Sequence, residues 1–224
     1  MTERRTAGSW RTRLAAGAVV TGLAAALAGC GSGGSGGSGG HALDVSGLMK
    51  LADGVHAKPT AKCPVPYDIA AAAKSAGVSG TAAPATGTDA VEADTQTGAD
   101  RDSVLVTFNG AILTCAYQVG GETVTVATTA THKKDAALPM MMPLIQRDAT
   151  MASADARTFV DRSTKADTGT ATVTPSGNVA VVRLKSTDSG ALELILTAGK
   201  DGHSSLSSAK VGHLAEQLAG QADW

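Results

Sequence analysis

Three cysteine side chains are the most reactive groups in this sequence. Cys30 follows an apolar stretch, whereas Cys63 and Cys115 stand far from it and from each other. Neither of the latter two belongs to a C-x-x-C pair or has a histidine near it, which disfavours a redox pair or a metal site. An even pair of cysteines in an exported protein is most simply a disulfide. Closing a loop of about 50 residues would stabilise the fold by about 4 kcal/mol in the chain-entropy description.

Sulfur also occurs as thioether in the run Met140-Met141-Met142, which is flanked by two prolines. Thioethers are soft ligands that suit Cu(I), and His132 upstream could supply a nitrogen ligand. Adjacent residues project in different directions, however, whereas metal ligands have to converge on one point. Methionine also fills irregular apolar gaps. Core packing or a ridge facing a partner is therefore the favoured interpretation, and a copper-handling site is the alternative.

Catalysis by a Ser-His-Asp group stays open, because the members of such a group meet in space rather than in sequence order. No nucleophile elbow, H-E-x-x-H pair or phosphate-binding loop stands in a suitable strand or helix context. The sequence therefore predicts a non-catalytic protein without a cofactor, and an envelope hydrolase is the alternative. The histidines on which a hydrolase would draw are His41, His56, His132, His203 and His213.

Carboxylates gather between residues 89 and 102, in a small and polar stretch that is typical of a long loop. Their oxygens could attract calcium, but they lack the spacing and the central glycine of a calcium-binding loop. A solvated loop is therefore favoured, with an edge strand around Ala90–Ala93. The carboxylates are those of Asp89, Glu92, Asp94, Asp100 and Asp102.

The chain begins with a positively charged segment and then an apolar one, the layout of an export signal. Four arginines precede Leu14–Leu27, a run too short to span a bilayer core, which needs about 20 apolar residues. The next residues, Leu27-Ala28-Gly29-Cys30, resemble the lipobox of bacterial lipoproteins. That resemblance implies a signal peptide over residues 1–29 and a diacylglycerol on the Cys30 sulfur. An ordinary secretory signal with an incidental cysteine is the alternative.

A flexible tether is predicted between this lipid anchor and the folded part. Gly31–Lys58 begins with glycine-serine repeats and lacks apolar periodicity, so it would reach roughly 25 to 32 Å as a random coil. Two acyl chains on Cys30 would hold the protein on a membrane stably. We therefore expect residues 30–58 to tether one domain, residues 59–224, to the extracytoplasmic face of the cell membrane.

The composition disfavours nucleic-acid and sugar binding. The sequence has 19 basic and 20 acidic residues, and residues 1–29 hold four of the arginines and one glutamate. The remainder has 15 basic and 19 acidic residues, a net charge of about −4, without the basic stripe that phosphate backbones require. Aromatic residues make up 3% of the chain, which leaves few rings for stacking once the core is filled.

The clearest local pattern is in Ser103–Thr131, where alternating apolar residues surround two turn signals. Asn109-Gly110 and Gly120-Gly121 both have the composition of two-residue hairpin turns. Folding the segment on these turns gives three strands with one common apolar face and points Cys115 into the core. The predicted meander has the pairs Phe108–Ala111, Val106–Leu113, Val104–Cys115, Val119–Glu122, Tyr117–Val124 and Cys115–Val126.

Helical spacing of apolar residues occurs in three segments, Ile69–Ala76, Pro143–Val160 and Ser208–Ala219. The first is rich in alanine and ends at Gly77, a natural helix stop. Because alanine buries little surface, this helix would dock weakly by itself. A disulfide between the two distant cysteines would fasten its start to the middle strand of the meander.

Three short strands near residues 170–174, 178–186 and 191–198 form a second predicted meander, because turn-forming stretches separate them. The order of helices and strands predicts an α+β fold, in which an antiparallel sheet of two meanders is packed by about three helices and carries one disulfide. The side chains expected to face inward are those of Ala180, Val182, Leu184, Leu192, Leu194 and Leu196.

This layout is similar to that of uncharacterised actinobacterial extracytoplasmic lipoproteins, and it also resembles mycobacterial kinase sensor domains and PsbP-like domains. The shared features are Cys30, Cys63, the strand "TCAYQV" and the closing "VGHLAEQLAG". The resemblance brings no catalytic residues. Together with the anchor, it implies a membrane-anchored, non-catalytic lipoprotein that binds a protein partner or a small ligand at the cell envelope.

Overall fold

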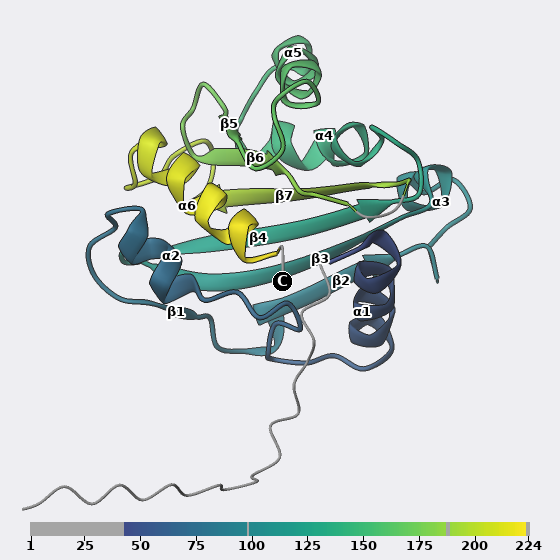
Figure 1. Ribbon diagram of the computed structural model, residues 1–224, viewed down its shortest axis with the longest axis horizontal. Coiled ribbons are helices and arrows are strands. Elements are labelled where there is room, and N and C mark those ends of the chain that lie inside the picture. Colours follow the sequence, from purple (N-terminus) through teal and green to yellow (C-terminus); the bar gives the residue numbers. More distant parts are fainter. Residues whose placement is uncertain (1–42, 98, 187–188, 223–224) are drawn as a thin grey trace, which may run out of the picture. The chain divides into compact units, whose positions relative to one another are not determined.

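The computed structural model describes residues 43–97, 99–186 and 189–222, which form a seven-stranded antiparallel sheet packed by helices (Figure 1). The strand order is β1-β3-β4-β7-β6-β5, and β2 lies beside β1 along the same edge of β3. The predicted α+β class with an antiparallel sheet is therefore confirmed. The strands are β1 (Ala82–Pro84), β2 (Val91–Thr95), β3 (Gly110–Val119), β4 (Glu122–Thr131), β5 (Ala171–Val173), β6 (Val179–Arg183) and β7 (Ala191–Ala198).

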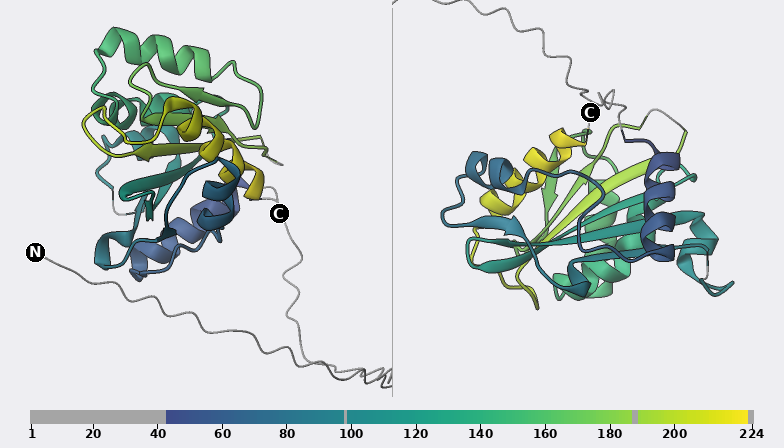
Figure 2. Two further views of the ribbon diagram at one scale, coloured as in Figure 1. Left: turned by 90° about the vertical axis from the view of Figure 1, so that its left-hand side faces the viewer. Right: turned by 90° about the horizontal axis from the view of Figure 1, so that it is seen from below.

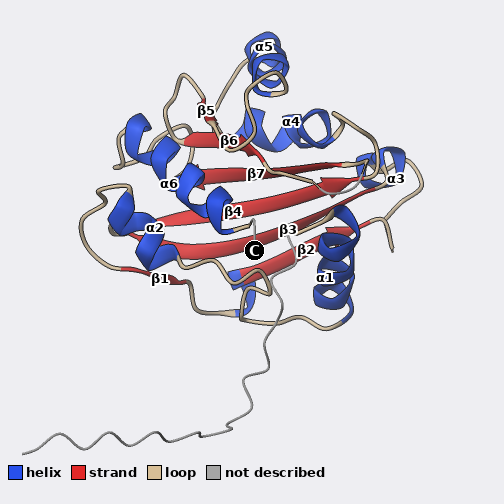
Figure 3. Cartoon of the chain, viewed as in Figure 1, coloured by secondary structure: helices blue, strands red, loops and turns tan. Residues whose placement is uncertain are grey.

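Helices cover both faces of this sheet (Figure 2). The described residues contain six α-helices, more than the three predicted from apolar spacing, together with one turn of 3-10 helix, η1 (Figure 3). Helices α1, α2 and α6 pack on one face and α3, α4 and α5 on the other. Their bounds are α1 (Val45–Ala57), α2 (Ile69–Ser75), η1 (Thr88–Ala90), α3 (Val104–Phe108), α4 (Ala137–Asp148), α5 (Ser153–Ser163) and α6 (Ser208–Gln221).

Successive side chains of each central strand enter two different hydrophobic clusters. Leu194 and Leu196 of β7 join the cluster under α1, α2 and α6, whereas Ile195 joins the one under α4 and α5. A shift of one residue would exchange the two sets, so burial on both faces fixes the strand register. All six side chains predicted to face inward in the second meander belong to the first cluster.

The disulfide between Cys63 and Cys115 is confirmed, and its Cα atoms lie 5.7 Å apart. Cys115 is buried in β3, and Cys63 lies in the segment that leads into α2. The Asp68 side chain accepts a hydrogen bond from Ala71 N at 2.9 Å and caps this helix, while Gly77 ends it with a φ of 68°. The bond thus holds the alanine-rich helix against the sheet, as its small buried surface requires.

The second hairpin turn of the first predicted meander is also confirmed. Gly120 and Gly121 both have positive φ, and Val119 pairs with Glu122 across the turn. The register continues through Tyr117–Val124 and Cys115–Val126, as the sequence predicted. Strands β3 and β4 therefore form the hairpin at the centre of the sheet.

The first predicted strand of that meander is wrong, because its residues form α3. The Ser103 hydroxyl accepts a hydrogen bond from Leu105 N at 3.2 Å and begins the helix. Asn109 ends it in the left-handed conformation with a φ of 51°, so Asn109-Gly110 closes a helix instead of turning a hairpin. The pairs predicted for Val104, Val106 and Phe108 do not form, and Val104 is 47% exposed.

Strand β2 occupies the edge of β3 that this segment was expected to fill. Val91 lies opposite Cys115 and Thr95 opposite Ala111. The edge strand predicted around Ala90–Ala93 is therefore present, and it completes an antiparallel meander of β2, β3 and β4.

The predicted tether is wrong from residue 45 onward, because Val45–Ala57 is helix α1. Asp44 caps the helix by accepting a hydrogen bond from Gly47 N at 2.5 Å. The buried residues Val45, Leu48, Ala52 and Val55 follow helical spacing, so the folded domain begins well before residue 59. Leu43 N donates to Ala222 O at 3.3 Å, which joins the start of the described domain to the end of α6.

The predicted helix from Pro143 to Val160 is instead the two helices α4 and α5. Pro143 lies inside α4 rather than in its first turn, and Thr150 ends α4 with a φ of 52°. The apolar residues Ile145, Phe159 and Val160 are buried as expected, but on two helices. The third predicted helix, α6, is confirmed with Ser207 as its cap.

The predicted signal peptide, lipobox and Cys30 lie outside the described residues. Among the residues that the structure describes, no helix is both long enough and apolar enough to cross a membrane.

Removing the disulfide tests its role as a brace. The double substitution Cys63→Ser and Cys115→Ser is expected to lower the free energy of unfolding by about 4 kcal/mol, because the bond closes a loop with a sequence separation of 52 residues. Denaturant titration measures the loss, and reduced wild-type protein serves as the matched control. An unchanged midpoint would contradict the assigned role.

Candidate functional site

The methionine run lies in α4 and serves mainly to pack the core. Met140 and Met141 are each 2% exposed and belong to the hydrophobic cluster under α4 and α5. Met142 is partly buried against the same cluster, and His132 is exposed at the end of β4. The geometry thus favours the packing interpretation over a copper site.

The described histidines do not assemble a catalytic group. His56, His132, His203 and His213 are all exposed, and none of their rings hydrogen-bonds to a serine or a carboxylate in the described structure. His41 lies outside the described residues.

The acidic loop brings three of its five carboxylates to one hollow, beside His56. Asp94, Asp100 and Asp102 line this hollow, which has a volume of about 520 Å³. Within the described residues, however, no three His, Cys, Asp or Glu side chains are placed to hold one metal ion.

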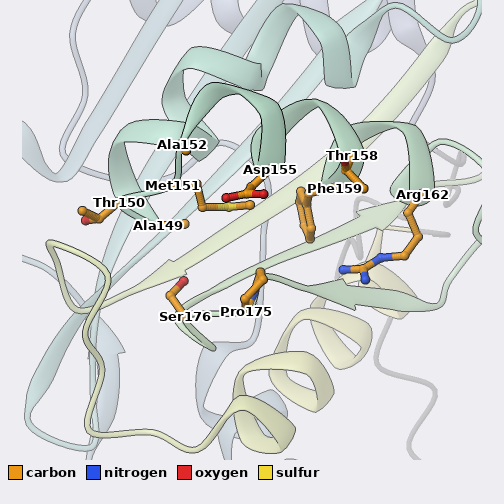
Figure 4. A pocket seen from close by; sticks show the side chains of 10 residues that line it. All are labelled: Ala149, Thr150, Met151, Ala152, Asp155, Thr158, Phe159, Arg162, Pro175 and Ser176. Carbon is orange, nitrogen blue, oxygen red and sulfur yellow. The ribbon is translucent and has the colours of Figure 1, made fainter.

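A second hollow, of about 460 Å³, lies between α5 and the turn from β5 to β6 (Figure 4). Phe159 and Arg162 extend from α5 toward Pro175 and Ser176 of that turn (Figure 4). These polar groups already have protein partners, because Arg162 Nη2 donates to Val173 O at 3.3 Å and Ser176 Oγ donates to Asn178 Oδ1 at 2.7 Å. Two of the polar groups of this hollow are therefore already engaged in hydrogen bonds within the fold.

The most unusual polar group is Glu193, in the middle of the sheet. Thr129 of β4, Glu193 of β7 and Arg183 of β6 lie opposite one another in a single cross-strand row. Glu193 is 4% exposed, and Thr129 is fully buried. Among the described residues, neither Glu193 Oε2 nor Thr129 Oγ1 has a hydrogen-bond partner. Because such buried groups normally find partners, the row has unused hydrogen-bonding capacity.

Glu193 lines a cavity of about 240 Å³, which we call the Glu193 cavity. Its walls come from the ends of β6 and β7 and from the loops that follow β4, α5 and β6. Gly190 borders it, where an added Cβ would lie 2.3 Å from Thr131 O and 2.7 Å from Val45 Cγ2. The lining residues are Lys134, Asp135, Thr168, Arg183, Leu184, Lys185, Ser186, Gly190, Ala191, Leu192 and Glu193.

Burial changes the charge state of Glu193. Desolvation raises the pKa of its carboxyl group to about 8, and Asp135 adds to the rise, while Arg183 opposes it. Arg183 Nε lies 3.9 Å from Glu193 Oε1, too far for a short charge-assisted hydrogen bond, so its attraction does not offset desolvation. We therefore describe Glu193 near neutral pH as mostly a neutral carboxyl group beside a cation, rather than one half of an ion pair.

The Glu193 cavity is not among the sites predicted from the sequence. The leucines of "ALELILTA" are predicted to face inward, and Glu193 between them has no predicted role. The face that carries Glu193 is covered by α4, whose Leu138 and Met141 belong to the same cluster as Ile195. The sequence does contain a sign of this cover, because Val179, Val181 and Ile195 lie on the same face as Glu193. Apolar residues on both faces of a strand indicate that both faces are buried.

Comparison with known proteins finds no matching family model, no similar curated protein and no similar solved structure.

The Glu193 pKa predicts how stability varies with pH. The Glu193 pKa rises from 4.5 to about 8 on folding, so the folded state binds this proton more tightly than the unfolded state does. The stability that the bound proton contributes is therefore complete below pH 4.5 and is lost by about pH 8. Across this window the unfolding free energy of wild type is expected to fall by about 1.4 kcal/mol per pH unit relative to Glu193→Gln. Denaturant titrations from acid to alkaline pH measure both chains, and parallel profiles would contradict the assignment.

Proposed function

We propose that this chain is a lipid-anchored extracytoplasmic protein whose single domain binds a small ligand without catalysis. The observation that carries the binding role is the Glu193 cavity, a polar hollow bordered by a buried carboxyl oxygen with no partner among the described residues. Convergent polar groups in a concave site, one of them with a strongly shifted pKa, are typical of ligand sites.

The anchoring part of the proposal rests on sequence. Residues 1–29 have the charge and apolar pattern of an export signal, and the lipobox-like Leu27-Ala28-Gly29-Cys30 supplies the acceptor cysteine. With α1 beginning at Val45, the predicted flexible segment shrinks to residues 31–42. A random coil of that length would reach roughly 17 to 21 Å, so the domain would stay close to the headgroups.

An envelope hydrolase is the second candidate, and one observation favours it. A carboxyl group with a pKa of about 8 is mostly protonated near neutrality and could act as a general acid. Glu193 has no histidine or cysteine beside it among the described lining residues, which leaves the nucleophile unassigned. Reporter esters, phosphoesters and glycosides test this candidate. If the chain hydrolyses one of them and Glu193→Gln abolishes the activity, the hydrolase function would replace the proposed binding function.

Substituting Cys30 tests the anchor. The native protein is expected to carry a diacylglycerol on Cys30 and to fractionate with the membrane, whereas Cys30→Ser should be released because the acceptor sulfur is gone. Intact-mass spectrometry and fractionation measure both effects. The Cys63→Ser, Cys115→Ser chain is the matched control and should stay in the membrane. Native protein with an unmodified Cys30 or an uncleaved leader would contradict the proposal.

Native mass spectrometry tests the ligand. Chain purified gently from its own membrane is expected to carry an extra mass of small-molecule size, and Glu193→Leu should lose it, because leucine removes the polar oxygens of the cavity. Asp155→Leu alters the hollow beside α5 and is the matched control. An identical extra mass on both variants, or none on wild type, would count against the Glu193 cavity as the binding site.

A further inference from the structure

We propose that the Glu193 cavity binds a phosphate group, held by Arg183, Lys134, Lys185 and the carboxyl group of Glu193. This inference rests on the proposed ligand-binding function and names the chemistry of its ligand. Phosphate oxygens only accept hydrogen bonds, whereas three of the four groups are cationic donors and the fourth donates when it is protonated.

The position of Arg183 suits an incoming anion. Its Nη1 donates to Ala166 O at 3.1 Å, which fixes one arm of the guanidinium. The other nitrogens stand apart from both acidic neighbours, with Nη2 3.9 Å from Asp135 Oδ1 and Nε 3.9 Å from Glu193 Oε1. The Arg183 guanidinium is therefore fixed at the cavity wall but forms no short ion pair. Its planar arrangement of N–H donors matches two phosphate oxygens.

The charges on the described cavity wall favour a dianion. Lys134, Arg183 and Lys185 contribute three positive charges and Asp135 one negative charge. With Glu193 neutral, these residues have a net charge of about +2, the opposite of a phosphate monoester, which carries about −1.5 to −2 at neutral pH. The cationic wall belongs to a chain that is weakly acidic as a whole, so the positive charge is a local feature of this cavity.

Binding is coupled to the proton on Glu193. Its surroundings are Thr129 on β4, Arg183 on β6, Asp135 and Lys134 in the loop after β4, and Lys185 after β6. Helix α4 covers this face with Leu138 and Met141, while its charged Arg147 and Asp148 pair with each other at the other end of the helix. The protonated carboxyl can donate to a phosphate oxygen and the ionised one would repel it, so affinity should fall as the pH rises through about 8.

Two sources could supply the phosphate group. Gly190 at the cavity border packs against Val45, the first residue of α1, so the cavity lies near the point where the predicted tether enters the domain. A lipid headgroup that is a phosphate monoester and a soluble phosphorylated compound would both present a dianionic phosphate there.

The test uses the full chain carrying Cys30→Ser, so that its result does not depend on the anchor. Titration calorimetry with inorganic phosphate is expected to show binding that Lys134→Met weakens about tenfold, the loss typical of one charge-assisted contact. Lys133→Met is the matched control, because its Nζ donates to Thr107 O and lies 5.7 Å from the Phe108 ring centroid. Both lysines are exposed, and circular dichroism checks that each variant is folded.

Sulfate isolates the proton coupling, because it stays a dianion across the neutral range while phosphate itself titrates. Sulfate affinity is expected to fall as the pH rises through about 8 in the parent chain and to stay level in Glu193→Gln. Vesicles that contain phosphatidic acid, whose headgroup is a phosphate monoester, then identify the source. Retention that Lys134→Met reduces indicates a headgroup, and phosphate binding without retention indicates a soluble ligand. Folded chain that binds neither phosphate nor these vesicles, or equal losses in the two lysine variants, would overturn the proposal while leaving the anchor intact.

Discussion

The continuous ladder of β3, β4 and β7, with helices packed on both of its faces, is the constraint on which the rest of this structure depends. Its buried apolar residues are divided between two separate clusters, so register, strand order and helix placement are linked. Cross-strand rows such as Leu113–Thr128–Leu194 and Thr114–Ala127–Ile195 alternate between the faces. The row that contains Thr129 and Glu193 differs from these because it buries a carboxyl group on the face under α4. A sheet that tolerates two unpartnered polar atoms there has a destabilising feature that invites a functional explanation.

One of the three helices on the face opposite Glu193, α2, buries mainly small side chains. Helix α2 contributes mainly alanines, and the disulfide holds the segment before it to β3. Tyr67 adds a polar contact in the same region, because its hydroxyl lies 2.9 Å from Thr128 Oγ1 inside the core. A covalent bond and a buried hydrogen bond thus support a helix whose apolar area alone is small.

The elements that were predicted correctly from the sequence are those whose structure is determined by neighbouring residues. The Gly120-Gly121 turn sets the β3–β4 register directly, because a two-residue hairpin leaves no freedom in the pairing. The prediction failed at Asn109-Gly110, since asparagine suits the left-handed end of a helix as well as a turn, and only the presence of β2 on the shared edge decides between them. Helix α1 was missed because Gly47 and Gly54 dilute its apolar stripe. Glu193 could not be identified as buried from its own strand, because the cover comes from α4, a separate segment.

The close approach of Gly190 to Val45 joins the start of α1 to the border of the Glu193 cavity. A force applied to the chain before Leu43 would act first on the Leu43–Ala222 hydrogen bond and on the start of α1, because these are the first contacts of the described domain. The border of the Glu193 cavity adjoins that point, whereas the β3–β4–β7 ladder lies beneath several covering elements. A force entering at this end of the domain would therefore reach the border of the cavity before it reached the central strands.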